Sequence, residues 1–127
     1  MNSLKLMYVD DEPDIREVAS FAFELDPAIE LRAHASGAAA LQALATDAWR
    51  PEVILLDVMM PDMDGPTTLD RIRQIAGLET TPAIFITARA LPQERAAFLA
   101  RGAVGVITKP FDPMTLASDV RSILAGA

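Results

Sequence analysis

The chain has 127 residues, of which 51% are hydrophobic and 23% charged, a composition that predicts a globular protein with one core. Eleven basic residues stand against eighteen acidic ones, and the net charge of -7 argues against direct binding to nucleic acid. Cysteine is absent and no apolar run approaches the ~18 residues of a membrane span, which excludes disulfides, thiolate metal sites and membrane insertion. We therefore expect a cytoplasmic protein with one domain over residues 1–127 and no effector domain in this chain.

Five short apolar runs predict buried strands, at about residues 4–9, 29–35, 53–56, 83–87 and 104–107. Three of the segments between and after these runs show apolar residues at helical spacing. These residues are Ile15, Val18, Ala19, Ala22 and Leu25 after the first run, Leu69, Ile72, Ile75 and Ala76 after the third, and Leu116, Val120, Ile123 and Leu124 after the fifth.

Residues that start and stop helices support the same division of the chain. Ser36 is expected to cap the second helix, and Asp112 to cap the fifth, with Pro113 at its first position. The third and fourth helices are expected to begin near Pro66 and Pro92 and to end at Gly77 and Gly102.

Strict alternation of strands and helices predicts an α/β fold with a parallel sheet and right-handed crossovers. We expect a three-layer (βα)5 sandwich in which the five strands, numbered along the chain, lie in the order 2-1-3-4-5. In such a sheet the functional site lies beyond the carboxyl ends of the strands, where the strand order reverses. This reversal falls between the first and third strands, which end in Asp10-Asp11 and Asp57.

Three carboxylates gathered in one crevice repel one another, by roughly 4 kcal/mol per pair at ~4 Å and an effective dielectric near 20. A cation would relieve this repulsion. Since the ligands available around Asp10, Asp11 and Asp57 are hard oxygens, the expected ion is Mg²⁺, with water completing its coordination.

Asp57, at the end of the predicted central strand, could attack a phosphoryl group and form an aspartyl phosphate. Phosphoryl transfer requires neutralisation of charge on the oxygens around phosphorus. Besides Mg²⁺, the ammonium of Lys109 and the hydroxyl of Thr87 are available for this, because each follows or ends a predicted strand. The sequence therefore predicts a complete phosphoacceptor site on four strand ends.

Over essentially its full length, the chain resembles the receiver domain of two-component response regulators, which has a CheY-like, flavodoxin-like fold. Four segments carry the resemblance, in the family's order and spacing. They are Val9-Asp10-Asp11-Glu12, Asp57 with Met60-Pro61-Asp62-Met63-Asp64-Gly65, Thr87-Ala88, and Lys109-Pro110-Phe111.

The resemblance implies that Asp57 takes a phosphoryl group from the phosphohistidine of a sensor histidine kinase or a histidine phosphotransfer protein. It also implies that Asp11, Asp57 and the Met59 carbonyl bind Mg²⁺, that Asp10 contacts a metal-bound water, and that the Lys109-Pro110 bond is cis. Such a domain is not an enzyme with a separate substrate. It assists its own phosphorylation and dephosphorylation, and it acts on an unknown downstream protein through the face of helix four, strand five and helix five.

One position departs from the family's pattern. Val106 stands three residues before the lysine, where receiver domains commonly have Tyr or Phe, so switching is expected to use a backbone shift as Thr87 bonds the phosphoryl group. Met59 and Arg89 flank the site and are large, and we expect them to slow hydrolysis of the acyl phosphate. Ala88 is small and leaves the approach to Asp57 open.

Other functions fit the same fold less well. A flavodoxin-like nucleotide or flavin domain needs hydrogen-bond donors in the loop after the first strand, where Asp10-Asp11-Glu12-Pro13 offers anions. A phosphatase of the haloacid dehalogenase type needs a D-x-D motif there, which Asp10-Asp11 lacks. A pseudo-receiver is disfavoured because all the chemical residues are present. A stand-alone regulator, a phosphorelay shuttle and a fragment of a larger regulator or hybrid kinase all stay open.

The remaining conspicuous side chains are expected to be structural. His34 is expected to lie at a sheet edge or on the surface. Trp49 is expected to cover the amino end of the sheet, opposite the site. The phenylalanines are expected to be packing residues, and they are Phe21, Phe23, Phe85, Phe98 and Phe111.

Overall fold

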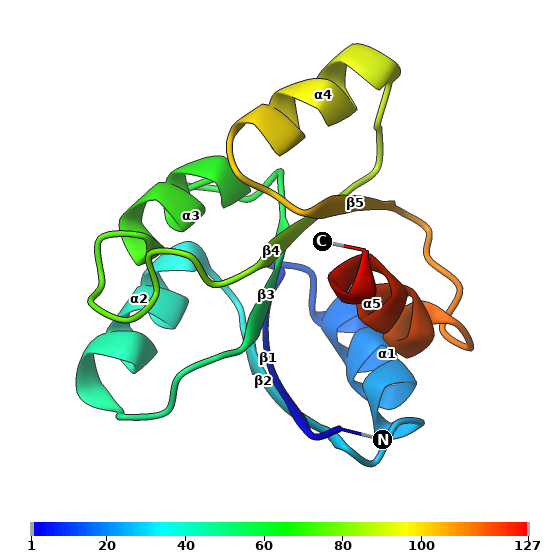
Figure 1. Cartoon of the computed structure of the whole chain (residues 1–127), viewed down its shortest axis with the longest axis horizontal. Helices are drawn as coiled ribbons and strands as arrows, with labels where there is room; N and C mark the ends of the chain where they lie inside the picture. The colour runs from blue at the N-terminus through cyan, green and yellow to red at the C-terminus, as the bar shows by residue number, and fades with distance from the viewer. Residues whose placement is uncertain (1, 127) are drawn as a thin grey trace.

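Five parallel strands form one sheet, in the order β2-β1-β3-β4-β5 (Figure 1). The computed structural model describes residues 2–126. The strands are β1 (Leu4–Val9), β2 (Ile29–His34), β3 (Val53–Asp57), β4 (Ala83–Thr87) and β5 (Gly105–Thr108). The predicted fold class and strand order are therefore confirmed. The predicted ends differ slightly, since β2 stops one residue earlier, β3 includes Asp57, and β5 lies one residue further along.

Five helices cover the two faces of the sheet. They are α1 (Pro13–Glu24), α2 (Gly37–Thr46), α3 (Gly65–Ile72), α4 (Pro92–Ala100) and α5 (Leu116–Ala125). Helices α1 and α5 lie on one face, and α2 and α3 lie on the other, with α4 beside β5 (Figure 1). None of the helices within residues 2–126 combines the length and the apolar character that crossing a bilayer requires.

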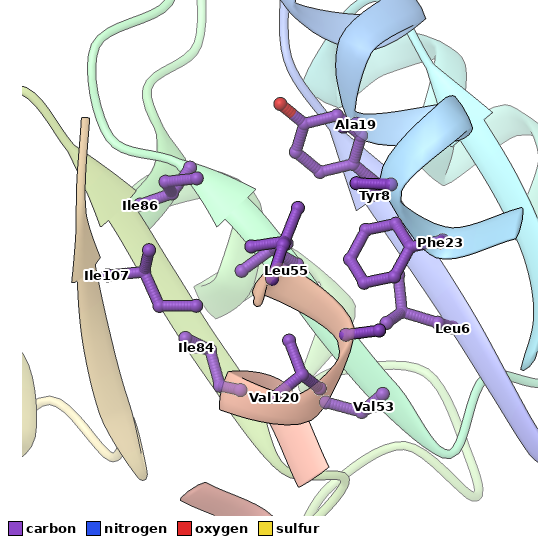
Figure 2. Packing of buried hydrophobic residues seen from close by; sticks show 13 residues of the cluster. Leu6, Tyr8, Ala19, Phe23, Val53, Leu55, Ile84, Ile86, Ile107 and Val120 are labelled. Carbon is purple, nitrogen blue, oxygen red and sulfur yellow. The ribbon is translucent and has the colours of Figure 1, made fainter. Parts of the chain in front are cut away.

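Alternate residues of β1, β3 and β4 enter two separate cores. Tyr8 and Leu55 belong to the core under α1 and α5, part of which Figure 2 shows. Val9 and Leu56, one residue further along the same strands, belong to the core under α2, α3 and α4. Because strands in the middle of such a sheet are buried on both faces, they appear in the sequence as continuous apolar runs. All five residues of β3 are buried.

Several predicted helix boundaries are confirmed. The Ser36 hydroxyl caps α2 by accepting a hydrogen bond from the Ala39 N–H at 3.0 Å. Pro92 is the first residue of α4, and Gly102 follows the helix with φ of +101°, a backbone conformation that favours glycine. Pro66 lies within the first turn of α3, as predicted.

Two predicted boundaries are wrong. Helix α3 ends at Ile72, so Ile75 and Ala76 lie outside it, because the N–H of Ile75 bonds to the carbonyl only three residues back, at 3.0 Å. Gly77 lies in the following turn. Helix α5 begins at Leu116, because the segment from Asp112 forms a separate turn: its side chain accepts from the Met114 N–H, and its carbonyl from the Thr115 N–H. Asp112 and Pro113 therefore precede the helix.

The buried stripe of α1 differs from the predicted one. Ala19, Ala22 and Phe23 face the core, whereas Val18 and Leu25 are exposed. Ala22 and Phe23 lie three and four positions after Ala19, so the three residues share one face of the helix. The predicted stripe included two of them, Ala19 and Ala22, together with residues outside this face. Phe21 is 58% exposed, and its prediction as a packing residue was wrong. The other four phenylalanines pack in the two cores.

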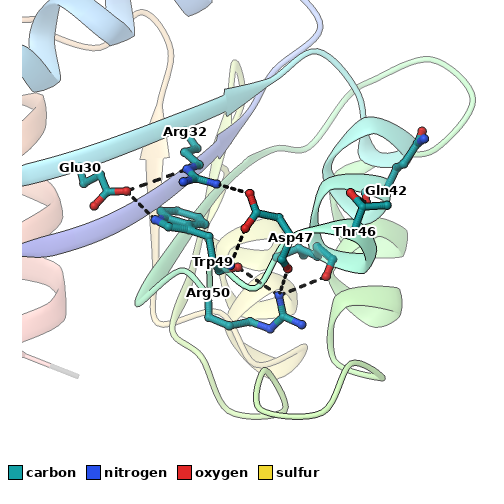
Figure 3. Close-up of polar contacts among 8 residues, drawn as sticks. Glu30, Arg32, Gln42, Thr46, Asp47, Trp49 and Arg50 are labelled. Atoms are coloured by element: carbon teal, nitrogen blue, oxygen red, sulfur yellow. Dashed lines mark hydrogen bonds and ion pairs between the residues drawn. The ribbon is translucent and has the colours of Figure 1, made fainter.

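Trp49 lies before β3, at the amino end of the sheet, as predicted. Its indole N–H donates to Glu30 Oε2 at 2.6 Å, and the Arg32 guanidinium lies 4.6 Å from its ring centroid (Figure 3). Arg32 also pairs with Asp47 at 2.8 Å. This polar cluster joins the edge strand β2 to the segment before β3. His34 ends the edge strand β2, also as predicted.

Candidate functional site

Three aspartates converge at the carboxyl ends of the neighbouring strands β1 and β3. One carboxylate oxygen from each of Asp10, Asp11 and Asp57 lies within 4.8 Å of the other two. Asp10 is fully buried and Asp57 is only 4% exposed. Since the two strands are paired side by side, the topology brings Asp57 to Asp10 and Asp11, although it lies 47 and 46 positions after them in sequence. These three residues form an acidic cluster that could hold a metal ion.

Lys109 supplies the positive charge beside the acidic cluster. Its ammonium lies 2.9 Å from Asp10 Oδ2, 3.3 Å from Asp57 Oδ2 and 3.6 Å from Glu12 Oε1. Burial opposes its charge, but the hydrogen bonds and charges of Asp10 and Asp57 outweigh this and raise the pKa of Lys109. The ammonium therefore stays protonated. The peptide bond to Pro110 is cis, as expected from the family resemblance.

The electrostatic environment of Asp57 disfavours its charged form. Burial, followed by repulsion from Asp10, raises the pKa of Asp57 to about 6, and the attraction of Lys109 only partly offsets these two effects. A carboxylate that is partly protonated near neutral pH is a poorer nucleophile. A cation bound at the acidic cluster would favour the ionised form, because opposite charge lowers the pKa of a carboxyl group.

The raised pKa of Asp57 predicts how stability varies with pH. The unfolded chain releases this proton at about pH 4, and the folded protein at about pH 6, so between these values the folded state binds more protons. We expect the contribution of Asp57 to lower the free energy of unfolding as pH rises through this window, by up to about 3 kcal/mol. A cation bound at the acidic cluster would compete with the proton, so it would remove the loss and bind more tightly as pH rises.

Urea unfolding at several pH values, with EDTA and with Mg²⁺, measures this effect. Because other carboxylates also titrate, the comparison is made with Asp57→Asn, in which the contribution of Asp57 is missing. The same pH dependence in both proteins without metal would contradict the prediction.

Thr87 and its neighbours occupy the end of β4. The Thr87 hydroxyl donates to the carbonyl of Arg89 at 3.0 Å and accepts from its N–H at 3.2 Å. The hydroxyl is thus engaged with the following loop and not with Asp57. Arg89 is exposed and pairs with Glu94 at 3.3 Å, while Ala88 is exposed beside it. On the adjacent strand β5, Val106 is buried.

The loop after β3 leads from Asp57 into α3. Met59 is 78% exposed, and Asp62 has φ of +70°, a left-handed conformation that Asp adopts more readily than most residues. Asp64 caps α3, because its side chain accepts from the Thr67 N–H at 2.8 Å. This loop thereby joins Asp57 to the start of α3.

Gly65 makes a close backbone contact with Asp57. A Cβ atom at Gly65 would lie 2.4 Å from the Asp57 carbonyl oxygen, and the Gly65 N–H already bonds to the Val58 carbonyl at 2.9 Å.

We expect Gly65→Ala to lower the free energy of unfolding by about 1–3 kcal/mol, since the backbone must shift to admit the methyl group. Urea unfolding measures this. Gly126→Ala is the control, because its Cβ would meet only ordinary contacts, and an equal loss in both variants would contradict the prediction.

Sequence reasoning missed two contacts of Asp10. The Tyr8 hydroxyl donates to Asp10 Oδ2 at 2.6 Å, and Arg16 donates to the Asp10 carbonyl at 2.8 Å. Asp10 follows Tyr8 by two positions in an extended segment, and side chains at this spacing lie on the same face of a strand. That spacing could have indicated the first contact. The second joins a helix to a strand end, and no sequence signal points to it.

Comparison with known proteins finds receiver domains and response regulators as relatives of this chain. Residues 6–121 match the family described as the response regulator receiver domain. Response regulator Rre1 of Synechocystis is 34% identical over 96% of this chain and 52% of its own length. The chemotaxis response regulator CheY4 of Vibrio cholerae is 30% identical, with a TM-score of 0.84 over 96% of this chain and 99% of that structure. The signal receiver domain of a histidine kinase from Syntrophus aciditrophicus is also 30% identical, with a TM-score of 0.78 over 98% of this chain and 92% of that structure. The chain spans about half the length of Rre1.

Proposed function

The chain belongs to the family of response regulator receiver domains, and from this premise we propose that Asp57 accepts a phosphoryl group in a two-component signalling system. The observation that supports this most strongly is the set of charges around Asp57. Lys109 lies between Asp57 and Asp10, and Asp11 completes the acidic cluster beside them. A largely covered lysine and two buried carboxylates thus meet at this edge of the sheet, as phosphoryl transfer to Asp57 would require.

The donors around Asp57 fit Mg²⁺, because they are carboxylate and carbonyl oxygens. We propose that Asp11, Asp57 and the Met59 carbonyl would bind the ion directly and that Asp10 would bind a metal-bound water. When bound, Mg²⁺ would neutralise charge on the phosphoryl oxygens and favour the ionised form of Asp57.

In the proposed reaction, a carboxylate oxygen of Asp57 attacks the phosphorus of a phosphohistidine. The new O–P bond forms as the N–P bond breaks, and the imidazole nitrogen keeps the electron pair. Lys109 would neutralise charge on the phosphoryl group. The Thr87 hydroxyl would exchange its bond with the Arg89 carbonyl for a bond to the phosphoryl group. Since Val106 offers no ring to rotate, the backbone after β4 would carry the resulting change.

We propose that the donor is a sensor histidine kinase or a histidine phosphotransfer protein. A downstream protein would bind the face of α4, β5 and α5, and the domain would act as a phosphoacceptor that assists its own phosphorylation and dephosphorylation. A cytoplasmic location belongs to the same proposal, because kinases that form phosphohistidine use ATP. The proposal concerns the domain itself, whether it acts as a separate regulator, as a shuttle or within a larger protein.

Intact-mass measurement after incubation with a small-molecule phosphodonor tests the proposed function. With Mg²⁺, the chain should gain the mass of one phosphoryl group, and the gain should be lost when EDTA replaces the metal. Loss of the added mass on treatment with neutral hydroxylamine, which attacks the carbonyl of an acyl phosphate and leaves phosphate esters intact, would indicate an acyl phosphate. An unchanged mass under all conditions would overturn the proposal and leave a pseudo-receiver that does not carry phosphate.

A further inference from the structure

Tyr8 places a polar atom at the border between a hydrophobic core and the acidic cluster. The residue is fully buried in β1, and its ring belongs to the core that includes Phe23 and Leu55. Figure 2 shows the hydroxyl oxygen pointing away from Phe23 and Leu55. It donates to Asp10 Oδ2 at 2.6 Å, a length typical of a hydroxyl bonded to an ionised carboxylate.

The Tyr8 hydroxyl is one of three donors that hold the Asp10 carboxylate. Oδ2 also meets the Lys109 ammonium at 2.9 Å, and Oδ1 accepts from the Glu12 N–H at 3.0 Å. Asp10 is fully buried, so bulk water does not contact it in this arrangement. Each donor therefore fixes part of its orientation, because a buried acceptor that loses a partner pays the desolvation cost of that group.

Lys109 and Tyr8 differ in what they can do during phosphoryl transfer. Lys109 also contacts Asp57 and Glu12, so its ammonium is shared among three carboxylates before any phosphoryl group arrives. Tyr8 has Asp10 as its only side-chain hydrogen-bond partner among the described residues. If Lys109 turns toward a phosphoryl group on Asp57, the Glu12 N–H still holds Asp10 Oδ1, and the Tyr8 hydroxyl is the donor that still holds Oδ2.

We propose that Tyr8 is a positioning residue, whose hydroxyl holds Asp10 in the orientation that serves metal binding and phosphoryl acceptance at Asp57. This inference rests on the proposed function. The side chain thus links the core under α1 and α5 to the chemistry at the strand ends.

Tyr8→Phe removes the hydroxyl and keeps the ring in its place. We expect Mg²⁺ to bind this variant about tenfold more weakly than the natural chain, because loss of a hydrogen-bond partner behind a metal-site carboxylate typically lowers affinity by about 10–100-fold. Calorimetric titration with Mg²⁺ alone measures this. Phe23→Leu is the control, since it alters the same core without touching a carboxylate, and it should keep the natural affinity.

A double-mutant cycle with Asp10→Ala separates positioning from packing. If the hydroxyl acts through Asp10, Tyr8→Phe should no longer weaken Mg²⁺ binding in the Asp10→Ala background. An equal loss in both backgrounds would overturn the inference.

Tyr8 is also the chain's one tyrosine, so its near-ultraviolet absorption reports on this hydrogen bond once Trp49→Phe removes the indole. Mg²⁺ should change that spectrum, and an unchanged spectrum at saturating Mg²⁺ would count against the inference. Equal Mg²⁺ affinity of the natural chain and Tyr8→Phe would overturn this inference alone. Failure of the natural chain to bind Mg²⁺ would overturn the proposed function with it.

Discussion

Asp57→Asn is expected to abolish phosphoryl transfer to this chain and to make the metal-free protein more stable. An amide of the same shape is not a nucleophile, so intact mass should stay unchanged after incubation with a phosphodonor and Mg²⁺. Because Asp57 is buried and Asp10 repels its charge, we expect its neutral replacement to raise the free energy of unfolding by about 1–3 kcal/mol at about pH 7. Urea unfolding in EDTA measures the second effect.

Asp62→Asn is the matched control for this variant. It removes the same charge from the loop that follows Asp57, but Asp62 is exposed, and its left-handed backbone suits asparagine equally well. This control should gain one phosphoryl group as the natural chain does, with little change in stability. A phosphoryl group on Asp57→Asn would show that another residue is the acceptor.

Lys109→Met is expected to destabilise the metal-free protein by about 3 kcal/mol. Removal of one partner from a buried ion pair typically costs about 3–5 kcal/mol, because the remaining charge is left without compensation. Here the lysine is mostly buried, and it is the one cation in the described part of the chain whose ion pairs include Asp10 and Asp57. Methionine keeps most of the apolar stem, so the change is chiefly in charge.

Unfolding of Lys109→Met in EDTA and in Mg²⁺ tests the origin of this loss. Mg²⁺ should restore part of the stability, because it supplies positive charge to the same carboxylates. Lys5→Met, at the other lysine of the chain, should unfold like the natural protein, since Lys5 is exposed. Unchanged stability of Lys109→Met without metal would show that the carboxylates do not depend on the ammonium.

The acidic cluster and Lys109 could be predicted from sequence because their positions follow from strand ends. In a parallel sheet, residues that directly follow neighbouring strands meet at one edge, so Asp10 and Asp57 need only a correct strand order to be brought together. Tyr8 could not be assigned in the same way. Its place in an apolar run indicates a core residue, which is correct for its ring, but the partner of its hydroxyl depends on the placement of atoms at the strand end.

The helices show the limits of sequence patterns more clearly. Helix α1 faces the sheet with Ala19 and Ala22, whereas the larger side chain of Phe21 is left exposed. A search for large apolar residues therefore misplaces the buried face by part of a turn. The end of α3 was mispredicted for another reason, because the apolar spacing continues through Ile75 after the hydrogen bonds have shortened to those of a turn.

The complete burial of β3 has a mechanical consequence. The strand is paired with β1 on one side and β4 on the other, and both of its faces are covered, so Asp57 is attached to the least deformable part of the sheet. An added chemical group there cannot be accommodated by fraying of its own strand. If a group is added to Asp57, we therefore expect the displacement to occur in the segments that follow β4 and β5, and not in the central strand.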